Sequence, residues 1–193
     1  MKKIINISTK EEVKFTKGDL PMMVHGKEHS GASLLSIVIA SMLHVGDKKL
    51  LMFTAYPMAK EEFLKQIENP ETVFYLESEN DFEKATKFQT IFVKSGDADL
   101  FTKAISNSSL VKDRIIFVKN IETINIPIFN FVSKYPFIIT GDLELNPLQK
   151  YFVDCDYSTR ILFNTVGNEK IVYLEKYQAI LKNRLGEKII TLN

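Results

Sequence analysis

The segment from Val24 to Ser33 constrains the fold of this chain more than any other feature, because it has the spacing of a phosphate-binding loop. Gly26 and Gly31 stand at the two glycine positions, and Ser33 stands where such loops carry the hydroxyl that binds magnesium. An apolar run precedes the loop, and a long apolar segment suited to a helix follows it. This order of strand, loop and helix predicts an α/β domain with the loop at the start of a helix.

The cation that normally serves such a loop is missing. Ala32 stands where a lysine would reach the β- and γ-phosphates of a nucleotide. Lys27 is the only cation within the loop, and Glu28 beside it would repel a polyphosphate. The glycine spacing of a phosphate-binding loop is therefore present, but the lysine that supplies its main positive charge is absent.

A second part of a nucleotide site also departs from the working pattern. The apolar run from Arg114 to Val118 predicts a buried strand, and working sites end such a strand in acidic residues that hold magnesium and activate water. Here the strand ends in Lys119 and Asn120, and a lysine would repel the metal. Glu122 lies slightly further along and is the nearest candidate to replace the missing acid.

These observations predict a vestigial site with neither a catalytic residue nor a metal ligand. Its nucleotide- or anion-binding part comprises Gly26, Lys27, Gly31, Ala32 and Ser33. Its second part comprises Lys119 and Asn120, which stand where working sites carry the acidic residues at the strand end. We expect no bound cofactor, although the loop amides leave room for weak binding of ATP with Mg²⁺ or of another anion.

Composition favours one domain over the whole chain, residues 1–193. The 193 residues are 45% hydrophobic, which is enough for a sizeable core. The net charge is +1, with 25 basic and 24 acidic residues interspersed, so the strongly basic face typical of nucleic-acid binding is not predicted. A single cysteine, Cys155, excludes an internal disulfide and suits a reducing compartment. With neither a signal peptide nor a long apolar run, we expect a cytoplasmic location.

Short apolar runs alternate with amphipathic segments, which predicts a mostly parallel sheet with helices on both faces and antiparallel strands at the ends of the chain. The predicted parallel strands are 20–24, 49–54, 72–76, 90–93, 114–118, 137–140 and 160–164. The predicted helices are 33–44, 58–67, 81–87, 99–106, 127–134 and 147–152. Segments 4–8 and 12–15 are expected to form a hairpin, and 171–174, 179–182 and 188–192 to form closing antiparallel strands.

Several segments together resemble the motor domain of the FtsK/SpoIIIE/HerA superfamily of P-loop ATPases. The first is Leu20 to Gly26 with the loop and helix that follow, then Lys49 to Phe53. Further along are Phe137 to Gly141, Tyr157 to Phe163, and Tyr177 to Lys182 followed by Gly186. In the superfamily, Thr140 would occupy a polar sensor position, and Arg160 would lie near a subunit interface. The resemblance implies a RecA-like P-loop NTPase fold.

The loop lysine and the acidic strand end are both missing, which makes the chain similar to a degenerate C-terminal ATPase domain of a type VII secretion protein, EssC or EccC. That resemblance implies one domain of a longer membrane-anchored protein, with the anchor upstream and this part in the cytoplasm. It implies a non-hydrolysing module of a secretion motor, acting in assembly, regulation or recognition of export substrates. The implied partners are neighbouring ATPase domains of the same chain or ring and secreted proteins, with no nucleic acid favoured.

Two alternatives stay open beside this interpretation. One is a functional NTPase with rearranged ligands, using Lys27 and Glu122. The other is a partner subunit of a DNA translocase. If the module binds a helical export signal, the expected lining is apolar residues at the carboxyl ends of the strands: Tyr56, Pro57, Met58, Tyr75 and Phe101.

Overall fold

The computed structural model describes residues 2–26, 30–120, 124–141, 156–163, 174–175 and 177–193. Its strands are β1 (Ile4–Asn6), β2 (Met22–His25), β3 (Lys49–Thr54), β4 (Val73–Leu76), β5 (Thr90–Val93), β6 (Arg114–Lys119), β7 (Phe137–Gly141), β8 (Thr159–Leu162), β9 (Gln178–Asn183) and β10 (Gly186–Leu192). Its α-helices are α1 (Ala32–Val45), α2 (Met58–Leu64), α3 (Phe82–Ala85), α4 (Ala98–Ser106), α5 (Ser108–Val111) and α6 (Ile126–Val132). Three short 3₁₀ turns are η1 (Lys17–Asp19), η2 (Pro70–Thr72) and η3 (Glu79–Asp81).

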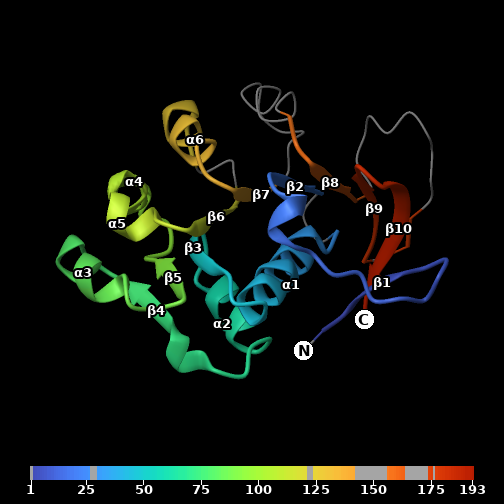
Figure 1. Ribbon diagram of the computed structural model, residues 1–193, viewed down its shortest axis with the longest axis horizontal. Coiled ribbons are helices and arrows are strands. Elements are labelled where there is room, and N and C mark those ends of the chain that lie inside the picture. Colours follow the sequence, from blue (N-terminus) through green and yellow to red (C-terminus); the bar gives the residue numbers. More distant parts are fainter. Residues whose placement is uncertain (1, 27–29, 121–123, 142–155, 164–173, 176) are drawn as a thin grey trace.

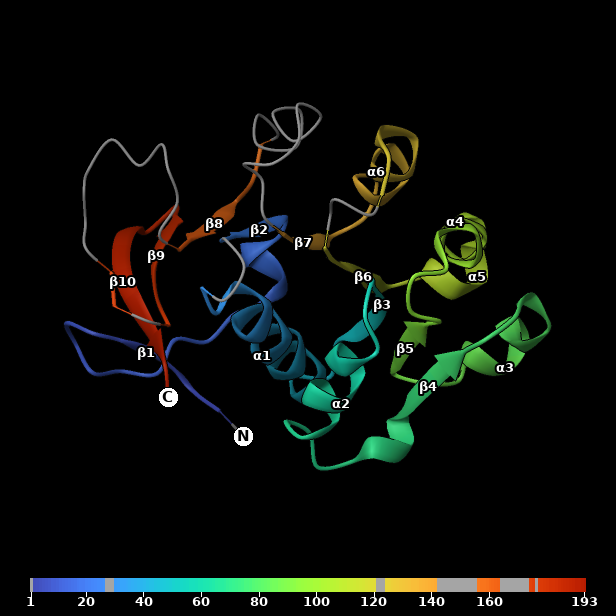
Figure 2. The same ribbon diagram turned by 180° about the vertical axis from the view of Figure 1, so that it is seen from behind.

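The described strands form one ten-stranded sheet in the order β1-β10-β9-β8-β2-β7-β6-β3-β5-β4 (Figure 1). From β8 to β4 every neighbouring pair is parallel, whereas β9, β10 and β1 are antiparallel. Figure 2 shows the antiparallel group at one end of the sheet, with both termini close together. The prediction of a mostly parallel sheet with antiparallel strands from the chain ends is therefore confirmed.

Helices cover both faces of the parallel part of the sheet, as Figure 1 shows. Along β3, Leu50 and Met52 point into one core with α1 and α2, while Leu51 and Phe53 point into a second core with α4, α5 and α6. Successive side chains of a strand alternate between faces, so a strand buried on both sides must be apolar throughout. This requirement explains why the central strands were recognisable as continuous apolar runs.

The predicted N-terminal hairpin is only partly formed. Its first strand, β1, pairs along its length with β10, and the second predicted strand contributes one bridge, between Ile5 and Glu12. The main-chain N–H groups of Lys3 and Asn193 also donate to each other's carbonyls, at 3.0 and 2.9 Å. β1 therefore pairs with β10 and also keeps local hydrogen bonds, since the Val13 N–H donates to the Ile4 carbonyl at 2.7 Å. The predicted helix 147–152 lies outside the described residues.

Two buried polar side chains tie together the amino ends of the central strands. The Arg114 guanidinium donates to four main-chain carbonyls, two of them at 2.7 and 2.8 Å, and is 2% exposed. Burial lowers the pKa of Arg114 to about 10. His44, near the end of α1, has one ring nitrogen 2.8 Å from the Thr90 hydroxyl and the other 3.1 Å from that of Thr72.

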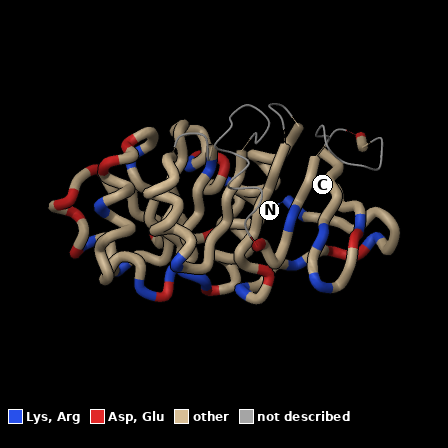
Figure 3. The backbone as a smooth tube through the Cα atoms, turned by 90° about the horizontal axis from the view of Figure 1, so that it is seen from above, with Lys and Arg blue, Asp and Glu red and all other residues tan. Residues whose placement is uncertain are grey.

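Charged residues of both signs are interspersed along the described trace (Figure 3). Ion pairs such as those of Lys182 with Glu187 and Lys65 with Glu62 lie at the surface. Exposed pairs of this kind contribute little to stability, about 0–1 kcal/mol each. The fold therefore rests mainly on its two apolar cores.

Candidate functional site

The predicted loop lies where β2 meets α1, at the carboxyl end of the parallel strands. Gly26 follows β2, and Gly31 is the N-cap of α1 with a φ of +100°. The structure therefore brings Gly26, Gly31, Ala32 and Ser33 together, while Lys27 lies outside the described residues. The strand, loop and helix arrangement predicted for this segment is present.

Both glycines are required by close packing. A Cβ atom on Gly26 would lie 2.4 Å from the Ser30 hydroxyl and 2.9 Å from the Cβ of Phe163. A Cβ atom on Gly31 would lie 2.6 Å from Cδ1 of Tyr177. These distances are shorter than real carbon contacts, so no other residue fits without movement.

Two aromatic side chains from the C-terminal part of the chain therefore pack on the loop. Phe163 follows β8, is 2% exposed and continues the strand by donating its N–H to the His25 carbonyl at 2.9 Å. Tyr177 precedes β9 and has a φ of +67°, a strained conformation for a bulky residue. Neither residue was predicted to lie at the site, because no local sequence pattern marks a contact between segments so far apart.

One main-chain N–H group at the start of α1 is hydrogen-bonded to a side chain of the loop. The Ala32 N–H donates to the Ser30 hydroxyl at 3.3 Å, and the Ala32 side chain is 4% exposed. Ser33 is exposed, and its carbonyl accepts a hydrogen bond from Ser36 at 2.8 Å. A lysine at position 32 would therefore extend from a buried position beside Gly26.

The end of β6 carries a cation. Lys119 lies beside Thr54 of β3 and Thr140 of β7 in the sheet register, and both threonines are buried. The Lys119 ammonium donates to the Asn120 side-chain oxygen at 3.1 Å and lies 5.9 Å from the centre of the Tyr56 ring. Thr54, Lys119, Thr140 and Val24 form one row of paired residues across neighbouring strands, and this row contains no carboxylate.

The row extends across β7 to the strand that leads into the loop. Thr140 pairs with Val24 of β2, so β7 is the single strand between the loop and Lys119. The Gly141 carbonyl accepts from the Gly26 N–H at 3.4 Å and lies 3.2 Å from Nδ1 of His25. The sheet therefore places the two parts of the predicted vestigial site at the same edge, with Glu122 outside the described residues.

The residues expected to line a partner site do not form one surface. Tyr56 and Met58 are 62% and 70% exposed, whereas Phe101 is fully buried and stacks on Phe53 at 4.6 Å. The expectation for Phe101 was wrong, because its helix turns that side chain into the core under β3. The ring of Tyr75 lies beneath the Lys60 ammonium, 4.4 Å from its centre.

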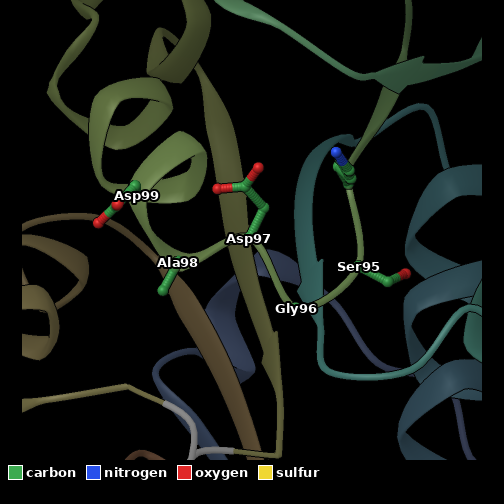
Figure 4. A pocket seen from close by; sticks show the side chains of 6 residues that line it. Ser95, Gly96, Asp97, Ala98 and Asp99 are labelled. Carbon is green, nitrogen blue, oxygen red and sulfur yellow. The ribbon is translucent and has the colours of Figure 1, made fainter.

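A shallow hollow of about 430 Å³ lies at the carboxyl end of β5. It is lined by residues 94–99, which lead from β5 into α4 (Figure 4). Asp97 lies beside it, but its carboxylate accepts the Leu100 N–H at 2.9 Å and so caps α4. Within the described residues, no three histidine, cysteine or acidic side chains gather into a possible metal site. In the same part of the chain, no helix has the length and apolar character needed to cross a membrane.

Comparison with solved structures identifies the fold. The genome packaging NTPase B204 of Sulfolobus turreted icosahedral virus 2, solved with ATPγS, matches with a TM-score of 0.62 and 14% identity, over 89% of this chain and 96% of that chain. The fold is that of a P-loop NTPase. No family model matches the sequence, and no curated protein matches it either.

Secretion ATPases share this fold. The cytoplasmic domain of the type VII secretion ATPase EccC from Thermomonospora curvata matches with a TM-score of 0.61 and 12% identity, over 99% of this chain. A structure of ATPases 2 and 3 of that EccC, in complex with a signal sequence peptide, matches with a TM-score of 0.59 and 12% identity, again over 99%. This chain spans 26% and 40% of those two chains, respectively.

Proposed function

We propose that this chain is a degenerate, non-hydrolysing ATPase domain of the FtsK/SpoIIIE/HerA kind, with a RecA-like core, that works in a type VII secretion motor. Its role there is in assembly, regulation or recognition of export substrates. The observation that carries the proposal is the charge pattern at one sheet edge: Ala32 stands at the lysine position and Lys119 at the acid position.

The position of Lys119 opposes a bound magnesium ion. A Mg²⁺ ion about 4 Å from an ammonium group is repelled by roughly 8 kcal/mol at an effective dielectric of 20. The ammonium contacts the Asn120 side-chain oxygen at 3.1 Å and the face of the Tyr56 ring. A nucleotide that depends on magnesium would therefore meet repulsion where a working site provides attraction.

The packing of the loop supports the same conclusion. The Tyr177 ring lies against Gly31, and the Ser30 hydroxyl accepts the Ala32 N–H. In a working loop, N–H groups at the start of the helix bind phosphate oxygens. Here one of them has an internal partner, and a neighbouring glycine lies beneath an aromatic ring.

The partners that we propose are neighbouring ATPase domains of the same chain or ring and secreted proteins. The EccC chains of similar fold are longer than this one, and the one that comprises ATPases 2 and 3 was solved with a signal sequence peptide. By this proposal the domain is cytoplasmic and reaches the membrane only through an upstream anchor.

Phosphate release from ATP in the presence of magnesium tests the proposal. We expect no turnover from the wild-type chain or from Ala32→Lys, because the lysine restores one charge and leaves Lys119 in place. Circular dichroism of Ala32→Lys must first show the wild-type spectrum, since Ala32 is buried. Turnover by either protein would contradict the proposal and favour an NTPase with rearranged ligands such as Lys27 and Glu122. Salt-dependent binding to duplex DNA would favour the translocase alternative.

A further inference from the structure

A second surface lies at the opposite edge of the sheet from the loop, at the amino ends of the parallel strands. A hollow of about 440 Å³ opens there between η1 and the C-terminal end of α1. Phe15 and Leu43 form a buried apolar floor, and Met42 lies beside them half-buried. The hollow therefore offers an apolar site that the described residues leave open.

The charged residues that line this hollow are positive, and two acidic residues, Asp19 and Asp47, adjoin the lining in the sequence. Lys17 and Lys48 are the charged residues in its lining. Arg184 adds a third cation, since its Nη2 atom lies 3.9 Å from where a Cβ on Gly18 would stand. The neighbouring carboxylate of Asp19 accepts from the N–H and hydroxyl of Thr16, at 2.8 and 3.0 Å.

Two exposed aliphatic residues are chain neighbours of residues at the hollow: Val45 precedes the lining residue Gly46, and Leu185 follows Arg184. Leu185 is 84% exposed at the tip of the β9–β10 hairpin, next to Arg184, and Val45 is 54% exposed at the end of α1. The Leu185 N–H donates to the side chain of Asn183 at 3.0 Å, which fixes the two-residue turn. Single exposed aliphatic residues are common, but here two of them are chain neighbours of residues at an apolar hollow that is lined by two lysines.

We propose that this surface binds an acidic amphipathic segment of a partner protein. An aliphatic anchor of the segment enters the hollow over Phe15 and Met42, and its carboxylates lie on Lys17, Lys48 and Arg184. Charge decides against a symmetric contact of two copies through this surface, because the second copy would present the same lysines and arginine and be repelled. The proposal does not depend on the proposed function, since it uses neither the loop nor the end of β6.

The test uses methyl NMR spectra of the full chain with two synthetic peptides. One is a helical peptide of about 15 residues with leucines at helical spacing and glutamates elsewhere, and the other has lysine in place of every glutamate. We expect the glutamate peptide to shift the methyl signals of Val45, Met42 and Leu185, and the lysine peptide to leave them unchanged.

Charge reversal provides the matched comparison. Lys17→Glu with Lys48→Glu should weaken binding of the glutamate peptide by about tenfold, from two lost ion pairs of 0.5–1 kcal/mol each. Lys87→Glu with Lys112→Glu changes net charge equally at exposed positions in other parts of the chain and should leave affinity unchanged. Leu185→Ser, at the exposed tip, should weaken binding without affecting folding.

Three outcomes would overturn the proposal. The glutamate peptide could shift signals elsewhere on the chain, bind the Lys17→Glu with Lys48→Glu variant as tightly as wild type, or bind no better than the lysine peptide. If phosphatidylserine vesicles shift these methyl signals and the glutamate peptide does not, the surface is a membrane contact and the protein partner is wrong.

Discussion

Replacing Gly31 by alanine tests the packing of Tyr177 on the loop. Two effects add at this position. The φ of +100° disfavours any residue with a Cβ, by about 1–2 kcal/mol. The new methyl group would also lie 2.6 Å from the Tyr177 ring, and overpacking of this kind destabilises by about 1–3 kcal/mol. We therefore expect Gly31→Ala to lower the free energy of unfolding by roughly 2–5 kcal/mol.

Gly186 is the matched control. Its φ is +114°, but a Cβ there would meet no heavy atom within 4 Å. Gly186→Ala should therefore lower stability by the backbone effect alone, about 1–2 kcal/mol. Urea unfolding followed by circular dichroism suits both variants, because the chain contains no tryptophan.

A double-mutant cycle isolates the ring contact. With Tyr177→Ala already present, Gly31→Ala should destabilise no more than Gly186→Ala does, which gives a coupling of about 1–3 kcal/mol. Equal effects of Gly31→Ala in the wild-type and Tyr177→Ala backgrounds would refute the contact between the Tyr177 ring and Gly31. Equal effects of Gly31→Ala and Gly186→Ala would refute it as well.

Two further predictions concern the buried polar groups at the amino ends of the strands. Arg114→Met should lower the free energy of unfolding by about 2–4 kcal/mol in urea titrations, because four carbonyls lose charged donors while the burial of a charge is relieved; a variant as stable as wild type would show that the guanidinium does not hold these strands. Burial is the main cause that lowers the pKa of His44 below 6.5, against a smaller opposing effect of Asp47. The unfolded chain therefore takes up the proton first, so stability should be full above pH 6.5 and fall as the pH drops below it towards the folded-state pKa. Unfolding curves at several pH values check this, and a His44→Gln variant with the same pH dependence would contradict it.

The central strands could be predicted from sequence because burial on both faces imposes a continuous apolar run. Residues 49–54 and 90–93 were predicted with the bounds that β3 and β5 have. The loop was equally visible, since Gly26 and Gly31 are separated by a fixed number of residues and are followed by a helix. These features depend on local sequence alone.

The features that could not be predicted depend on contacts between distant segments. β1 pairs along its length with β10, whereas residues 12–15 pair with it through one bridge, between Ile5 and Glu12. Phe163 and Tyr177 contact the loop glycines from more than 130 residues away. Phe101 has an apolar character that suits either a core or a surface, and the packing of α4 on Phe53 decides for the core.

Calorimetric titration of the wild-type chain with ATP and Mg²⁺ tests the central claim most directly. A site with Ala32 at the lysine position and Lys119 at the acid position predicts no saturable heat in the micromolar range, and no gain when magnesium is added to ATP. Micromolar binding that requires magnesium would contradict the account.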